Sequence, residues 1–149
     1  MCIRDRLRVR RALGRRGTWF ANASYRLYGD TWDVMSQTVN AQVLHSVDEE
    51  RYLLGLHMRA YFQGSADFYQ AYYQGDGELP EFRTRDRTLG GMRTLHGSVT
   101  CDAALTGESG PEAWRLRGML AATQFVFSNF PAQRERRALT LGVTVVAPL

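Results

Sequence analysis

Hydrogen-bonding and cationic side chains recur at every second position in several segments of this chain, and they are the groups best suited to chemistry. Neutral polar groups spaced in this way can line water or interlock as a plug, and arginines among them can attract anions. Arg26 and Arg59 are the best placed for that role, although ion pairs with Asp33 or Asp102 are the simpler interpretation. If these segments enclose an interior space, or lumen, the residues predicted to line it are Asn22, Ser24, Arg26, Ser36, Thr38, Asn40, Gln42, His57, Arg59, His96, Ser98 and Thr100.

Signatures of an enzyme are poor. The histidines His45, His57 and His96 show no metal-ligand spacing such as His-Glu-x-x-His, and there is no Gly-x-Ser-x-Gly elbow or phosphate-binding loop. We therefore expect no catalytic residues, no metal and no cofactor. The enzymatic alternative is a site that pairs His57 or His96 with a nearby serine.

The elements that position these side chains alternate apolar and polar residues for about ten positions each. Leu54, Leu56, Met58, Ala60 and Phe62 alternate with polar residues and glycine, and positions 19–28 and 138–145 repeat the pattern. Side chains of a strand point to opposite faces, so each segment has one apolar and one polar face. Strands of about 9–11 residues tilted by about 45° cross a bilayer, whereas strands of soluble sheets average about 5–6. The pattern therefore predicts transmembrane β-strands.

The segments predict an all-β fold, an antiparallel up-and-down meander of about six long strands. Gly29-Asp30 is the first hairpin turn, and the connection over about 65–87 is long enough to be a loop. Counting strands back from Leu149, with the C-terminus in the periplasm, makes that loop extracellular. The predicted strands are 18–29, 31–46, 50–64, 88–106, 112–128 and 136–147.

Six strands do not close a barrel, because known outer-membrane barrels begin at about eight. An open sheet would leave unpaired edge groups in lipid, each costing several kcal/mol. Residues 18–149 are thus expected to be the C-terminal part of a transmembrane β-barrel, and a porin-like one if the interior is open.

The basic residues of the chain are concentrated at its start. Seven of the 19 arginines lie in the first 16 residues, and from Gly17 onward 12 arginines are outnumbered by 14 acids. A basic segment confined to one end is poor support for a phosphate-binding surface, so we expect no nucleic-acid partner.

The N-terminal segment does not look native. Residues 1–6 read Met-Cys-Ile-Arg-Asp-Arg, which resembles translated sequencing adapter at the edge of a metagenomic contig. We expect residues 1–17 to be a non-native or poorly ordered fringe, since they also lack the apolar stretch of a signal peptide. Outer-membrane proteins need such a signal, so the prediction is that truncation removed it.

Two segments carry a more specific signal than alternation. Residues 25–33 read Tyr-Arg-Leu-Tyr-Gly-Asp-Thr-Trp-Asp, and residues 65–69 read Ser-Ala-Asp-Phe-Tyr. They resemble an uncharacterised family of Gram-negative outer-membrane β-barrel proteins of unknown function, of which this chain would be a C-terminal fragment. The resemblance implies a location in the bacterial outer membrane and a barrel architecture, but no activity. The expected partners are outer-membrane lipid, the barrel-assembly machinery and the missing N-terminal strands.

Aromatic residues near the predicted strand ends fit that location, because amphipathic rings concentrate at bilayer interfaces. The predicted interface aromatics are Trp19, Tyr25, Tyr28, Trp32 and Trp114.

The functional expectation is a structural role or passive passage of small solutes, without enzymatic activity. The first alternative is a soluble β-barrel or sandwich that binds a small apolar ligand, in which the Leu54 to Phe62 row would point inward. The second is an outer-membrane enzyme with a titratable pair on its extracellular rim.

Overall fold

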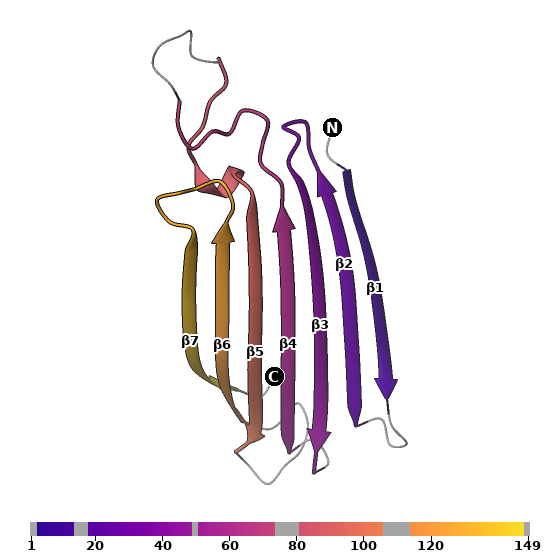
Figure 1. The fold of residues 1–149 in the computed structure, drawn as a ribbon. Helices are drawn as coiled ribbons and strands as arrows, with labels where there is room; N and C mark the ends of the chain where they lie inside the picture. Colours follow the sequence, from indigo (N-terminus) through magenta and orange to yellow (C-terminus); the bar gives the residue numbers. More distant parts are fainter. Residues whose placement is uncertain (1–2, 14–17, 49–50, 74–80, 106–113, 148–149) are drawn as a thin grey trace.

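The computed structural model of the chain describes residues 3–13, 18–48, 51–73, 81–105 and 114–147. These residues form one seven-stranded sheet in which the strands follow chain order and every neighbouring pair is antiparallel (Figure 1). A short 3-10 helix, η1 (Arg87–Leu89), lies in the longest connection. The predicted all-β up-and-down meander is confirmed. The strands are β1 (Ile3–Leu13), β2 (Trp19–Gly29), β3 (Met35–Val47), β4 (Tyr52–Gln63), β5 (Met92–Ala104), β6 (Arg115–Phe127) and β7 (Glu135–Val146).

The sheet has seven strands rather than six because Ile3–Leu13, which the sequence leaves outside the predicted fold, forms β1. Its register pairs Leu7 with Tyr25 and Val9 with Ala23, so apolar residues of β1 extend the apolar face of β2. Arg8 and Arg10 alternate with them on the other face. The arginines obscure this alternation, because so many charges in a short segment are not typical of a membrane strand.

The first hairpin turn is longer than the predicted Gly29-Asp30. Gly29 pairs with Met35, so residues 30–34 form the connection and β3 begins at Met35. The carboxylate of Asp30 accepts hydrogen bonds from the backbone N–H groups of Trp32 and Val34, and Asp33 has a positive φ of 59°. Side-chain capping of this kind holds a wider turn than dipeptide patterns indicate.

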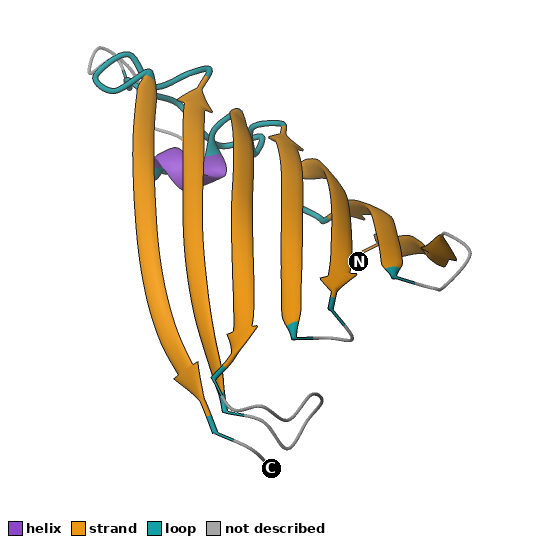
Figure 2. Ribbon diagram, turned by 90° about the horizontal axis from the view of Figure 1, so that it is seen from below, coloured by secondary structure: helices purple, strands orange, loops and turns teal. Residues whose placement is uncertain are grey.

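The two faces of the sheet differ sharply in chemistry. Register places Ala41, Met58 and Gly97 side by side on one face, which we call the apolar face, and Asn40, Arg59 and His96 on the other, the polar face. The sheet is curved (Figure 2). Side chains on the polar face are the more deeply buried, Thr38 being 3% exposed, whereas Met58 is 51% exposed on the apolar face. Side chains converge on the inside of a curve and splay on its outside, so the polar face is the concave one.

No hydrophobic core underlies the described sheet. Apart from Gly29 and Gly55, the buried residues of its strands are Ala121 and Phe127 together with five polar residues, Ser24, Ser36, Thr38, Ser98 and Asp102. The hydrophobic cluster of Val34, Ala66 and Tyr69 lies instead among the loops at one end.

Successive connections alternate between the two ends of the sheet (Figure 1). We call the described parts of the connections at one end the rim; these are residues 30–34, 64–73, 81–91 and 128–134. β1 and β7 each pair with one neighbour, so the described sheet is not closed. Among the described residues no helix is long and apolar enough to cross a membrane.

Candidate functional site

All twelve residues predicted to line a lumen lie on the polar face, because they share one parity in the strand registers. β1 extends this face with Arg6, Arg8 and Arg10, whose direct partners across the pair are Arg26, Ser24 and Asn22. The sequence contained the signal for these three arginines in their every-second-residue spacing. The high arginine content of the segment and its lack of a signal peptide predict a fringe instead, and that prediction conceals the three residues.

A hollow of about 310 Å³ opens on the polar face over β1–β4, lined by Arg6, Arg26, His57 and Arg59 among polar neighbours. Its lining comes from three successive rows of side chains on the polar face. Across the strands these rows read Arg6, Arg26, Thr38; then Ser24, Asn40, Arg59; then Asn22, Gln42, His57. Arg8 and Arg10 continue the second and third rows on β1, next to the hollow.

The side chains that line the hollow use only part of their hydrogen-bonding capacity on one another. The guanidinium of Arg26 donates to the Thr38 hydroxyl at 3.5 Å, and the Asn40 amide donates to the Ser24 hydroxyl at 3.3 Å. The Asn22 side-chain oxygen is buried and has no hydrogen-bond partner among the described residues. Arg59 lies 6.0 Å from the centre of the Tyr61 ring. Among the described residues, the guanidinium groups of Arg6 and Arg59 make no hydrogen bond and that of Arg26 makes one, so the hollow keeps free donors.

The expected pairing of Arg26 or Arg59 with Asp33 or Asp102 is wrong. Asp102 is paired with Arg117 through two contacts of 2.7 and 2.9 Å between guanidinium and carboxylate. These two residues face each other directly across β5 and β6, closer than Asp102 is to β2 or to Arg59 on β4. Asp33 lies in the rim turn, and within the described residues no ion pair joins Arg26 or Arg59 to an acid.

The histidines do not form the rim site that the enzymatic alternative requires. His57 and His96 face one another on the polar face with ring centres 5.6 Å apart, and a ring nitrogen of His96 lies 2.8 Å from the Thr123 hydroxyl. His57 is directly opposite Ser98 in the register. His45 lies near the end away from the rim and stacks on Trp19. The described rim contains no histidine.

The motif at residues 28–34 is organised by one carboxylate. Asp30 accepts hydrogen bonds from the Tyr28 hydroxyl at 3.0 Å and from the N–H groups of Trp32 and Val34 at 2.9 and 3.1 Å. Burial raises the pKa of Asp30, but these hydrogen bonds outweigh it and leave the pKa below its ordinary value.

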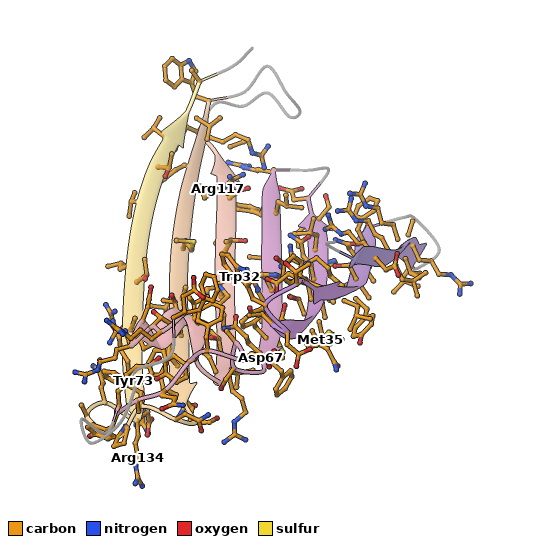
Figure 3. The ribbon with its side chains drawn as sticks, turned by 90° about the horizontal axis from the view of Figure 1, so that it is seen from above. Trp32, Met35, Asp67, Tyr73, Arg117 and Arg134 are labelled. Atoms are coloured by element: carbon orange, nitrogen blue, oxygen red, sulfur yellow. The ribbon has the colours of Figure 1, made fainter. Side chains whose placement is uncertain are left out.

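The motif at residues 65–69 packs directly against that hairpin. The N–H of Asp67 donates to the Trp32 carbonyl, and the Phe68 ring meets the Trp32 ring edge to face. Trp32 and Asp67 lie together at the rim end in Figure 3. Buried Tyr69 donates its hydroxyl to the Asn129 carbonyl, tying the long connection to the last hairpin. The two sequence motifs therefore form one structural unit at the rim.

The predicted interface aromatics occupy different places. Trp19 and Tyr25 lie on the apolar face and are exposed, whereas Tyr28 lies on the polar face and Trp32 belongs to the rim. Trp114 is exposed just before β6. Periodicity separates Tyr28, at an even position, from Trp19 and Tyr25, at odd ones, whereas only the hairpin geometry places Trp32.

Comparison with known proteins gives one family and no closer relative. The family described as "Protein of unknown function (DUF3570)" matches residues 6–116. The chain belongs to this family. No curated protein and no solved structure matches it.

The DUF3570 match covers β1 from Arg6 onward, the whole of β2–β5 and both rim motifs. It begins at Arg6 and so includes Arg8 and Arg10, which the sequence placed in a non-native fringe. The adapter interpretation of residues 1–6 stays a prediction. In the part of the chain that the structure describes, no group of three or more His, Cys, Asp or Glu residues could hold a metal ion.

Proposed function

We propose that this DUF3570 chain forms part of an outer-membrane β-barrel with a structural role or a role in passive passage of small solutes. The observation that carries the proposal is the exposed apolar face of a sheet whose concave face is polar. A protein in water reverses this arrangement, burying its apolar side chains and exposing its polar ones.

The apolar face is continuous across the whole sheet. One row of direct neighbours, from β1 to β7, consists only of apolar residues and glycine, and the next row toward the end away from the rim is apolar except for Arg11. Leu141, on β7, is 78% exposed. Contiguous exposed apolar area of this extent marks a surface that another apolar medium covers. The first row is Val9, Ala23, Ala41, Met58, Gly97, Ala122 and Leu139.

The height of this face suits a bilayer. On β4 its residues run from Tyr52 to Phe62, about 34 Å of strand at about 3.4 Å per residue. A tilt of about 40° reduces that length to about 26 Å, close to the apolar band of about 25 Å on outer-membrane barrels. Toward the rim the face turns polar at Gln37, Arg93 and Glu135.

The open edges support the remaining parts of the proposal. Unpaired backbone groups of β1 and β7 would each cost several kcal/mol in lipid, so further strands of the same polypeptide are proposed to close the barrel. Such a protein reaches the bacterial outer membrane with a signal peptide and the barrel-assembly machinery. The polar face then lines the lumen, and the proposal assigns no catalytic step.

A soluble barrel or sandwich with an apolar ligand inside receives less support. It would need the row from Leu54 to Phe62 to face inward, but that row lies on the convex face, and the described residues place no second sheet over it.

Neighbouring residues on opposite faces provide the test. Met58→Arg places a charge on the apolar face near mid-height, and in the full-length protein it should cost about 2–4 kcal/mol of stability in lipid. His57→Arg is the matched control on the polar face, with an expected cost below about 1 kcal/mol. The measurement is urea unfolding from lipid vesicles. Equal losses for both variants, or folding that needs no lipid or detergent, would contradict the proposal.

A further inference from the structure

We infer that the hollow over β1–β4 is a binding site for small oxyanions, the group shared by phosphates and carboxylates. The inference rests on the proposed function, since it names the solutes that the polar face would select. The juxtaposition that carries it is a set of arginines from β1, β2 and β4 around one hollow, without a carboxylate among them.

The arginines lie close enough to one another to repel, which costs stability unless a negative charge lies between them. Arg6 and Arg26 are direct partners across the β1–β2 pair, where like charges destabilise a sheet. Arg6, Arg8 and Arg10 also follow one another on the same face of β1, about 7 Å apart along the strand. An anion between them converts this repulsion into attraction.

The rest of the polar face does not compensate these charges. Asp102 is the only carboxylate that the described strands place on this face, and Arg117 already engages both its oxygens. The carboxylates of Asp5 and Glu135 belong to the apolar parity. Within the described part of the chain, the positive charge of the hollow is therefore uncompensated.

The chemistry of the lining suits an oxyanion better than a simple halide. A guanidinium presents a planar fork of donors that binds carboxylate or phosphate through two parallel hydrogen bonds. The Arg26 fork spends only one long hydrogen bond on Thr38, and neutral side chains such as Gln42 surround it with further donors. A volume of about 310 Å³ accommodates a pyrophosphate or a small dicarboxylate with water.

The strands that close the proposed barrel could instead bring carboxylates to these arginines. The arginines would then be structural, and two measurements separate the cases. Structural pairing predicts that removing Arg26 lowers stability while the wild-type protein binds no anion. An oxyanion site predicts binding that disappears on substitution while the free energy of unfolding without anion stays equal or rises.

The experiment uses the purified full-length protein in detergent micelles. Calorimetric titrations with pyrophosphate, inorganic phosphate and succinate measure affinity and distinguish phosphate from carboxylate sources. Arg26→Gln with Arg59→Gln should weaken the tightest of these ligands about tenfold or more, because charge-assisted hydrogen bonds of that strength are lost. Arg93→Gln, on the apolar face, is the matched control and should leave affinity unchanged. Arg59→Lys keeps the charge but removes the fork, so an intermediate loss is expected.

Conductance across planar bilayers tests the proposed passage of solutes separately from the proposed anion-binding site. A reversal potential under a salt gradient should show anion preference that weakens at about 1 M salt, where screening acts within about 3 Å. Binding without conductance would overturn the passage but retain the site. Conductance without anion preference, in a wild-type protein that binds none of the three anions, would overturn the site and leave the passage standing. If the double variant does not fold, these wild-type measurements still decide.

Discussion

Asp102 and Arg117 form an ion pair on the polar face, and within the described residues the arginines of the hollow form none. Asp102 is 5% exposed and receives two hydrogen bonds from a guanidinium that is itself half exposed. The arginine also reaches water but the carboxylate does not, so the carboxylate depends more on the pair for its hydrogen bonds than the arginine does. The sequence predicts such an ion pair for Arg26 and for Arg59, but among the described residues neither has an acidic partner.

Arg117→Ala should therefore destabilise the protein, because it leaves a buried carboxylate with unsatisfied oxygens. A cost of about 1–3 kcal/mol is expected in unfolding from lipid vesicles. Arg137→Ala is the control, since its partner Glu135 is 42% exposed and surface pairs contribute about 0–1 kcal/mol. Equal costs for the two variants would show that the Asp102 carboxylate is not isolated from water in the assembled protein.

The lowered pKa values of two rim carboxylates predict that the rim loses stability in acid. Hydrogen bonds from the Thr88 N–H and hydroxyl hold the pKa of Asp86 below its ordinary value, and hydrogen bonds likewise leave the pKa of Asp30 lowered. A carboxyl with a depressed folded pKa stabilises the fold above its unfolded value, near 4, and loses that contribution as pH falls through the folded pKa. Rim structure should thus be constant from pH 7 to 5 and weaken below about pH 4.

The measurement is fluorescence of Trp32, which packs on Phe68, with the other tryptophans replaced by Phe. Asp30→Asn and Asp86→Asn together should remove most of the acid transition. A transition that persists unchanged in this variant would assign it to other groups.

At the scale of elements, alternation was sufficient to find β2–β7 within a few residues, because the period of two is a direct consequence of strand geometry. It failed where another pattern obscured it, in the arginines of β1, and where side chains rather than dipeptides set the turn, at Asp30. The rim could not be built from the sequence, since Tyr69 and Asn129 are brought together only by the complete meander. The loop interval 74–80 and the turn at 106–113 lie outside the described residues.

Glycines of neighbouring strands test the packing of the two faces. A Cβ on Gly55 would overlap the Thr100 hydroxyl and approach a Leu44 methyl group to 3.1 Å, whereas a Cβ on Gly97 would meet nothing within 4 Å. Gly55→Ala should cost about 1–3 kcal/mol through overpacking. Gly97→Ala should be neutral or stabilising by up to about 1 kcal/mol, since it removes backbone freedom from the unfolded chain. Unfolding titrations of both variants check this contrast, and a reversed order would contradict the register.

At the scale of the whole molecule, the loops at the rim end of the described sheet contact one another, whereas its two edge strands have no partner on their outer sides. The rim connects three hairpins. Tyr69, Ser65 and Arg87 of the long connection contact Asn129 or Gln133 of the last one, and the Asp67 N–H donates to the Trp32 carbonyl of the first. β1 and β7 meanwhile expose backbone groups along their full length. Contacts among the loops at one end and unpaired strands at both edges are what the proposal of a larger barrel requires.

Sidedness is the prediction that belongs to this scale, because all rim connections must lie on one side of the proposed membrane and the β3–β4 turn on the other. With Cys2 and Cys101 replaced by Ala, single cysteines at Gln70 and at Arg51 probe the two ends, both positions being exposed. A membrane-impermeant thiol reagent added to intact cells that express the full-length protein should label Gln70→Cys and not Arg51→Cys. Disrupting the outer membrane should expose Arg51→Cys to the reagent as well. Labelling of Arg51→Cys alone in intact cells would invert the topology, and labelling of both would place the sheet outside a membrane altogether.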